Sequence, residues 1–221
     1  MSGDEFSQRI EAMNALLEDE AFWEKRNAEL MEARKRASEE LRQLEDARLR
    51  KKWGEIPDTY RQPFVPSKSK LSAATVDFCR HWKPDGGHGI GISGPTGMGK
   101  TRILVAVLHR YHKNNPWLYL PATSLSRAVA EQWHDDWKIA YEAERILKLA
   151  RRVRILLIDD LYNERASDAS SVELLELVEH RTANLRPILW TTNSTMEQLE
   201  ARHGIRGAPI TRRLTEFCET F

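Results

Sequence analysis

The sequence predicts an α/β fold: a parallel sheet with helices on both of its faces, preceded by a long N-terminal helix. Three observations support this prediction. Short apolar runs alternate with helical stretches from residue 71 onward, which is the order of elements that builds parallel sheets. A glycine-rich motif joins one apolar run to a helix, and another run ends in two carboxylates. The first 52 residues contain no proline and are rich in strong helix formers.

Length and charge limit the classes of function. The chain has 221 residues, of which 41% are hydrophobic and 30% charged, enough for one α/β domain and an appendage. A formal net charge of +1 gives no overall attraction to nucleic acid or membranes, so such a contact requires a local patch. No apolar run reaches the roughly 18–20 residues that span a bilayer, and the N-terminus does not resemble a secretory signal. We expect a cytoplasmic protein without a membrane partner.

The two cysteines, Cys79 and Cys218, lie far apart and lack the spacing of metal ligands. A reduced protein without zinc is the simplest interpretation.

Residues 5–52 predict one long amphipathic helix or a broken pair of helices. Apolar residues recur at helical spacing in two stretches, first at Phe6, Ile10, Met13 and Leu17 and then at Ala37, Leu41 and Leu44. The apolar stripe is narrow, which favours pairing with another helix, for example from a partner protein. The alternative is a solvated charged helix that packs on its own domain.

A linker follows at residues 53–70, where three prolines interrupt any periodicity. Its apolar residues Ile56, Tyr60 and Phe64 either anchor the linker or wall an adenine pocket, and the sequence alone favours anchoring. The expected organisation is therefore an N-terminal partner-binding segment at 1–52, this linker, and a nucleotide-binding domain at 71–221.

The glycine-rich motif has the pattern G-x-x-x-x-G-K-[ST] of a phosphate-binding loop. It consists of Gly94, Pro95, Thr96, Gly97, Met98, Gly99, Lys100 and Thr101. An expected strand at 88–93 precedes it and an expected helix at 102–111 follows, which is the order this loop requires. Glycines let backbone N–H groups surround phosphates, Lys100 reaches the β- and γ-phosphates, and the Thr101 hydroxyl binds Mg²⁺. The sequence therefore predicts a nucleotide site.

A second motif lies at residues 153–161, where an apolar run ends in Asp159 and Asp160. A buried parallel strand delivers acids to its carboxyl end in this way. We expect Asp159 to help hold Mg²⁺ and Asp160 to polarise the attacking water. The alternative is a chance Asp-Asp turn after a strand.

The remaining elements complete the strand–helix alternation. Helices are expected at 71–82, 124–149 with a break within 132–138, 170–183, 196–202 and 209–217, and strands at 116–120 and 187–193. One strand separates the phosphate-loop strand from the acid-bearing strand in the sequence. The later strand ending at Asn193 would then insert between them and bring its amide near the γ-phosphate.

Positive charge gathers at the end of the helix expected at 124–149. The residues are Arg145, Lys148, Arg151, Arg152 and Arg154. They either form a solvated helix end beside its negative dipole or contact a phosphate backbone.

Four segments together resemble the AAA+ ATPases of the helicase-loader and transposition-helper clade, the DnaC and IstB-like proteins. They are G-P-T-G-M-G-K-T, I-L-L-I-D-D-L, W-T-T-N and T-R-R-L, and the I-P-D-T-Y-R linker and the R-P-I-L-W-T-T-N spacing agree with them. The resemblance covers about residues 53–217 and implies an ASCE-type P-loop NTPase that uses ATP and Mg²⁺.

The resemblance also implies residue roles. Residues 94–101 correspond to Walker A, Asp159 and Asp160 to Walker B, and Asn193 to sensor 1. Arg213 is the arginine finger, with Arg212 a close rival, and such a finger completes the site of a neighbouring subunit. Self-assembly through Arg213 in trans is therefore expected.

Three departures from the AAA+ pattern bear on function. Asp160 stands where most AAA+ proteins have glutamate, which makes strong hydrolysis by an isolated chain less expected. The chain stops at Phe221, so we expect no C-terminal lid domain and no sensor 2 arginine, and a fifth strand has to come from residues 217–221. The N-terminal stretch has no cysteines for the zinc module of some loaders.

The expected function is that of a DnaC-like helicase loader. It would act with a replicative helicase, held by the N-terminal helix, and with single-stranded DNA. One alternative is an IstB-like helper ATPase with a transposase as its partner. An alternative of another class is a non-hydrolysing, ATP-bound adaptor that works through its N-terminal coiled coil.

Overall fold

The computed structural model describes residues 5, 8, 20–163 and 166–221. The chain divides into an N-terminal unit, residues 1–53, and a C-terminal unit, residues 54–221. The expected apolar positions Phe6, Ile10, Met13 and Leu17 lie outside the described residues.

The N-terminal unit contains one continuous helix, α2 (Glu20–Trp53, 34 residues). Intrahelical ion pairs support it, for example between Arg36 and Glu32 at 2.6 Å, as expected for charged residues four apart. Phe22 and Trp23 form an edge-to-face pair with ring centroids 5.4 Å apart, yet 42% and 40% of their surfaces stay exposed. The helix therefore shows apolar side chains on a surface that is otherwise charged.

The C-terminal unit is built on a five-stranded sheet in the order β2-β3-β4-β1-β5. The strands are β1 (Gly89–Ser93), β2 (Trp117–Pro121), β3 (Ile155–Leu161), β4 (Ile188–Thr192) and β5 (Cys218–Thr220). All neighbouring strands are parallel. The predicted insertion of the Asn193 strand between the phosphate-loop and acid-bearing strands is confirmed, and a fifth strand does come from residues 217–221.

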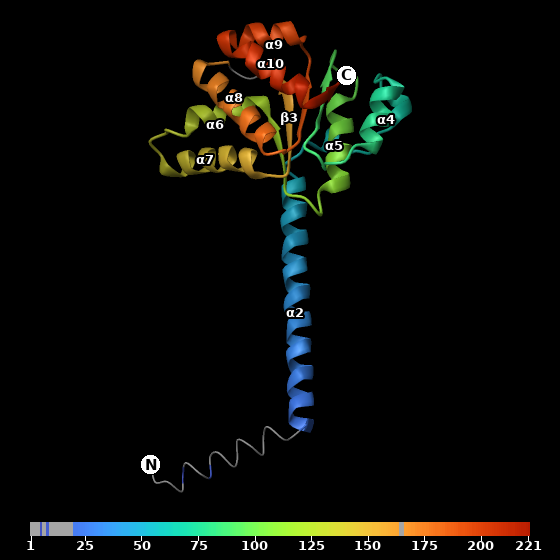
Figure 1. The fold of residues 1–221 in the computed structure, drawn as a ribbon, viewed down its shortest axis with the longest axis vertical. Helices are drawn as coiled ribbons and strands as arrows, with labels where there is room; N and C mark the ends of the chain where they lie inside the picture. The colour runs from blue at the N-terminus through green and yellow to red at the C-terminus, as the bar shows by residue number, and fades with distance from the viewer. Residues whose placement is uncertain (1–4, 6–7, 9–19, 164–165) are drawn as a thin grey trace. The chain divides into compact units, whose positions relative to one another are not determined.

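Helices cover both faces of this sheet (Figure 1). One side carries α4 (Ala73–His81) and α5 (Lys100–Tyr111). The other carries α6 (Ala122–Glu131), α7 (Trp137–Arg152) and α8 (Asp168–Ala183). Shorter elements are α3 (Asp58–Arg61), η1 (Pro66–Lys68), α9 (Met196–Arg202), η2 (Gly204–Arg206) and α10 (Gly207–Glu216). No helix in the described part of the chain is long and apolar enough to cross a membrane.

The main core fills the space between the sheet and helices α6, α7 and α8. Its buried side chains come from alternate positions of the central strands, such as Leu156 and Ile158 of β3, and from the facing helices, such as Leu147 and Leu177. Period-two alternation sends the intervening residues of β3 to the opposite face, toward α5. Asp159 belongs to that second set, so the strand that builds the core also carries an acid to the other side.

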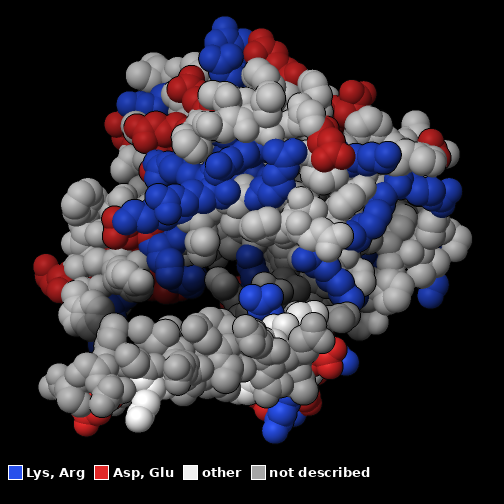
Figure 2. Space-filling model, turned by 60° about the horizontal axis from the view of Figure 1, so that its bottom comes forward, with Lys and Arg blue, Asp and Glu red and all other residues white. Residues whose placement is uncertain are grey.

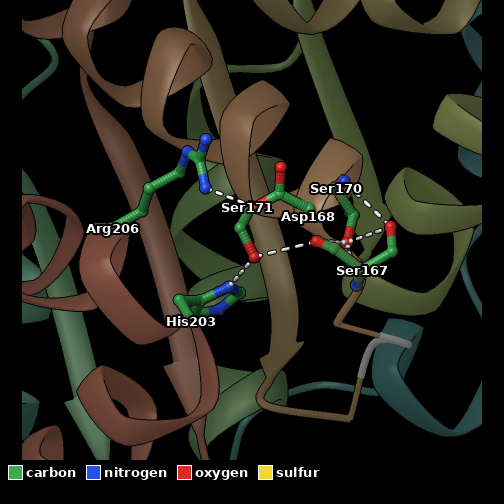
Figure 3. Close-up of polar contacts among 6 residues, drawn as sticks. All are labelled: Ser167, Asp168, Ser170, Ser171, His203 and Arg206. Atoms are coloured by element: carbon green, nitrogen blue, oxygen red, sulfur yellow. Dashed lines mark hydrogen bonds and ion pairs between the residues drawn. The ribbon is translucent and has the colours of Figure 1, made fainter.

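Polar side chains fix the first turns of α7 and α8. Asp136 caps α7 by accepting a hydrogen bond from the Lys138 N–H at 2.9 Å, which accounts for the predicted break before this helix. At the start of α8, Ser171 Oγ donates to the Ser167 carbonyl at 3.0 Å and lies 2.9 Å from Nδ1 of His203 (Figure 3). These contacts attach α8 to the segment that follows α9.

Candidate nucleotide-binding site

Three strand ends meet at one edge of the sheet. The phosphate loop follows β1, the two acids lie near the end of β3, and Asn193 follows β4. Because the strands are parallel, their carboxyl ends share this edge, where α/β proteins bind ligands. A cavity of about 290 Å³ opens there. It is lined by Tyr60, Lys68, Thr96, Gly97, Gly99, Lys100, Thr101, Arg102, Asp160 and Asn193.

The phosphate loop takes the conformation that its glycines allow. Gly97 and Gly99 have φ values of 79° and 98°, in the left-handed region that side chains rarely adopt. A Cβ atom at Gly99 would also approach Ser69 Oγ to 3.2 Å. Helix α5 begins directly after Gly99, so the positive end of its dipole faces the loop. This arrangement suits an anion such as a nucleotide phosphate.

Lys100 lies almost wholly buried beneath the loop, with 5% of its surface exposed. Its Nζ atom donates to the carbonyl oxygens of Gly94 and Pro95, at 2.6 and 2.8 Å, and to Asn193 Oδ1 at 2.8 Å. Burial lowers the pKa of this ammonium group, while Asp160 and Asp159 raise it. The closest contacts of Lys100 are neutral oxygens, which leaves its positive charge available to a phosphate.

Asp159 is fixed by three hydroxyl groups. Its Oδ1 atom accepts hydrogen bonds from Thr101 Oγ1 and Thr191 Oγ1, each at 2.7 Å, and Oδ2 accepts one from the Tyr119 phenol at 2.8 Å. The side chain is 3% exposed. A threonine hydroxyl next to a carboxylate is an all-oxygen donor set of the kind Mg²⁺ prefers. Thr101 and Asp159 therefore suit the metal that accompanies a nucleotide.

A bulge in β3 presents the two acids together. Ile158 pairs with Trp190 and Leu161 with Thr192, so Asp159 and Asp160 both lie opposite the single residue Thr191. Bulges of this kind re-aim side chains beside functional sites.

Within the bulge, Asp160 has a φ of 56°, a left-handed conformation that is uncommon outside glycine. The Thr191 hydroxyl oxygen accepts the Asp160 N–H at 2.9 Å, and Asn193 Nδ2 donates to Asp160 Oδ1 at 3.1 Å. Burial raises the pKa of Asp160, with Asp159 adding to the effect, whereas Lys100 and Asn193 lower it.

No protein-family model matches the sequence, and the search of curated proteins gives no match. Solved structures do match. A DnaC helicase loader superposes with a TM-score of 0.59 at 20% identity, covering 74% of this chain and 98% of that chain. DnaI gives 0.60 at 19% identity, covering 75% and 93%.

AMPPCP-bound DnaA from Aquifex aeolicus gives a TM-score of 0.57 at 16% identity, with 73% of this chain and 49% of that chain covered. The C-terminal unit has the AAA+ fold. The resemblance suggested by the motifs is thus confirmed at the level of the fold.

In this AAA+ fold the two candidate arginine fingers lie on α10, outside the cavity of their own chain. Arg213 is 3.9 Å from Glu179 and 3.7 Å from Glu216, and one third of its side chain is exposed. Arg212 is more exposed and lies 3.9 Å from Glu216. Neither arginine is among the residues that line the phosphate cavity. The action of either arginine as a finger on a neighbouring subunit stays a prediction.

The linker joins the AAA+ fold through Ile56, which is fully buried. Arg102 of α5 donates to the Thr59 carbonyl at 2.9 Å. Tyr60 lines the phosphate cavity, whereas Phe64 lines a separate cavity of about 340 Å³ beside α5. Ile56 therefore serves as an anchor, and the two aromatic residues face different cavities.

Most of the basic residues near the end of α7 have partners in their own domain. Arg145 donates to Glu142 at 2.8 Å, Lys148 lies 2.6 Å from Glu144, and Arg151 donates to Glu173 at 2.8 Å. Arg154 donates to the carbonyl of Pro84 at 2.8 Å. Figure 2 shows lysine and arginine side chains gathered on the face that it draws. Contact of the α7 end with DNA stays a prediction.

Sequence reasoning missed two hydroxyl groups that hold Asp159, those of Thr191 and Tyr119. The position of Thr191 could have been predicted, because β4 was expected beside the acid-bearing strand and alternate residues of a strand face the same side of the sheet. Tyr119 gives no such signal, since its phenol reaches along the sheet from a position paired with Leu157. Lys68 and Arg102 were also missed as cavity residues.

Proposed function

We propose that this chain is a Mg²⁺-dependent ATPase that acts as a replicative helicase loader. The observation that carries the proposal is the convergence of Lys100, Thr101, Asp159 and Asn193 at one sheet edge, with β4 between β1 and β3. Two of the matching structures are described as DnaC and DnaI, the first as a helicase loader, and a third holds AMPPCP, an ATP analogue. These likenesses support the proposal.

The phosphate-loop glycines and Lys100 would bind the phosphates, and Thr101 with Asp159 would hold Mg²⁺, whose charge would offset that of the phosphate oxygens. Asp160, fixed by the Thr191 hydroxyl and Asn193, accepts a hydrogen bond from the attacking water and takes up its proton. Asn193 contacts both Lys100 and Asp160, so it orients both groups at the edge of the sheet where the phosphates would bind. The short aspartate at position 160 makes hydrolysis weak in an isolated chain.

Arg213 supplies the remaining positive charge from a neighbouring subunit. One third of its side chain is exposed on α10, and its ion pairs with Glu179 and Glu216 are long, at 3.9 and 3.7 Å, so the side chain is accessible and weakly held. Cations at this position stabilise the charge that develops on the transferred phosphoryl group. Assembly of several chains would therefore switch on turnover.

Partners follow from the two units. We assign residues 1–52 to binding of the helicase, residues 53–70 to the linker and residues 71–221 to the ATPase domain. The exposed Phe22, Trp23 and Met31 of α2 supply apolar contact area for a partner helix. Single-stranded DNA is the second partner, which agrees with a DnaA match described as bound to AMPPCP and single-stranded DNA, at a TM-score of 0.54 and 15% identity. The protein would act in the cytoplasm.

The test is binding and turnover of ATP with Mg²⁺ by the wild type, Lys100→Ala and the control Lys113→Ala. Lys113 is exposed and does not line the cavity. Lys100→Ala should reduce turnover by about 10²- to 10³-fold, and Lys113→Ala should match the wild type. Equal turnover in all three proteins would contradict the site. Binding without hydrolysis, unaffected by single-stranded DNA or by a replicative helicase, would favour the adaptor instead.

A further inference from the structure

Tyr119 reaches the acid-bearing strand from the neighbouring edge strand. In the register of β2 and β3, Tyr119 pairs with Leu157 and Pro121 pairs with Asp159. Tyr119 and Pro121 lie two residues apart, so they share one face of the sheet. The phenol therefore extends along this face from its position beside Leu157 toward Asp159, and its hydroxyl oxygen lies 2.8 Å from Asp159 Oδ2.

The two oxygens of Asp159 are held in different ways. Oδ1 accepts hydrogen bonds from Thr101 and Thr191. Both threonines donate to this oxygen and not to Oδ2. Tyr119 is the donor that reaches Oδ2. Hydrogen bonds to an ionised carboxylate are stronger and more directional than those between neutral groups. With donors on both oxygens, the plane of the carboxylate is fixed.

The phenol is the donor in this contact, because an ionised carboxylate has no hydrogen to give. Tyr119 is half-buried and Asp159 is 3% exposed, so bulk water competes little for the contact. Tyr119 therefore acts as a donor, and the carboxylate stays an acceptor with lone pairs left over for a metal or its bound water.

We propose that Tyr119 is a positioning residue that orients the Asp159 carboxylate for Mg²⁺. The assignment rests on the proposed ATPase function and adds a residue from the edge strand to the metal site. Partners behind a metal ligand set its orientation, and their loss weakens metal affinity or activity by about 10- to 100-fold. Loss of the Tyr119 hydroxyl should therefore raise the concentration of Mg²⁺ that this chain requires.

The experiment measures ATP turnover and binding of a fluorescent ATP analogue over a range of free Mg²⁺, for the wild type, Tyr119→Phe and Tyr111→Phe. Tyr111 is a matched control, since it is also half-buried and donates its phenolic hydrogen to a carbonyl, that of Trp82 at 2.6 Å. A loss of thermal stability common to both variants would reflect only the missing hydrogen bond.

Tyr119→Phe should need about 10- to 100-fold more free Mg²⁺ for half-maximal turnover. At saturating Mg²⁺ its maximal turnover should return close to that of the wild type, and in EDTA its affinity for the analogue should be unchanged. Tyr111→Phe should need the same Mg²⁺ concentration as the wild type.

An unchanged Mg²⁺ requirement in Tyr119→Phe would overturn the assignment and leave the ATPase proposal intact. A lower maximal turnover of Tyr119→Phe with an unchanged Mg²⁺ requirement would also overturn it. A wild type that binds the analogue equally with Mg²⁺ and with EDTA would overturn the metal site and the role of Tyr119 together.

Discussion

The Thr191 hydroxyl donates a hydrogen bond to Asp159 Oδ1 at 2.7 Å. The oxygen of the same hydroxyl accepts the backbone N–H of Asp160 at 2.9 Å. One fully buried side chain on β4 thus fixes the direction of one acid and the left-handed backbone of the next. The position of both acids depends on a strand that is distant in sequence but adjacent in the sheet.

Replacing Thr191 with valine keeps the shape of the side chain and removes only this hydroxyl. We expect Thr191→Val to slow ATP turnover by about tenfold or more, because the Asp159 carboxylate and the Asp160 backbone each lose a partner. The free energy of unfolding should fall by about 1–3 kcal/mol, the cost of leaving buried polar groups unsatisfied. Turnover assays and thermal or urea unfolding measure the two effects.

The neighbouring Thr192 provides the control. It is also fully buried, and its hydroxyl donates to the Leu161 carbonyl at 2.7 Å without contacting either acid. Thr192→Val should lose a similar amount of stability and keep its turnover. Equal turnover losses in the two variants would show that the effect of Thr191 is a general loss of stability.

Asn193 is expected to contribute to ATP hydrolysis but little to nucleotide binding. Its amide contacts Lys100 and Asp160 at 2.8 and 3.1 Å, but the carbonyls of Gly94 and Pro95 also hold Lys100. Asn193→Ala should lower turnover by about 10²- to 10³-fold, as removal of a polarising amide does elsewhere, while ATP binding stays within a few-fold of the wild type. Asn184→Ala, an exposed asparagine at the end of α8, is the control. Loss of binding together with turnover in Asn193→Ala would contradict this separation.

The cysteines should be inert in the folded protein. Burial raises the pKa of Cys79 and of Cys218 to about 12. The native state therefore keeps both thiols protonated between pH 9 and 12, while the unfolded state releases the protons, so the free energy of unfolding should fall as pH rises through this range. At pH 8 iodoacetamide should modify neither thiol in the native protein and both in denaturant, measured by mass spectrometry. Rapid modification of native Cys79 at pH 8 would be inconsistent with its burial.

The order of elements could be predicted because each motif comes with its own secondary structure. A glycine-rich loop before a helix and two acids after an apolar run place β1, α5 and β3. The extra strand between those motifs then places Asn193 in the sheet. Local signals also located the break before α7, where Asp136 caps the helix.

The bulge in β3 could not be predicted in this way. Whether Asp159 and Asp160 face one residue of β4 or two depends on the register between strands about 30 residues apart, which local propensity does not record. The contact of Tyr119 with Asp159 depends on the same kind of register. The ion pairs near the end of α7 also depend partly on another helix, since Arg151 contacts Glu173 of α8. The sequence therefore located the positive charges but not their partners.

Arg213 of one chain is proposed to complete the ATP site of another. The most direct measurement is ATP turnover by Lys100→Ala, by Arg213→Ala and by an equal mixture of the two, with Arg127→Ala, an exposed arginine of α6, as a control. Each of the first two variants should be inactive alone, and the control should match the wild type. The mixture should recover up to about a quarter of wild-type turnover, because one in four head-to-tail interfaces then pairs an intact Lys100 with an intact Arg213. Full turnover by Arg213→Ala alone, or no recovery on mixing, would contradict a finger supplied in trans by Arg213.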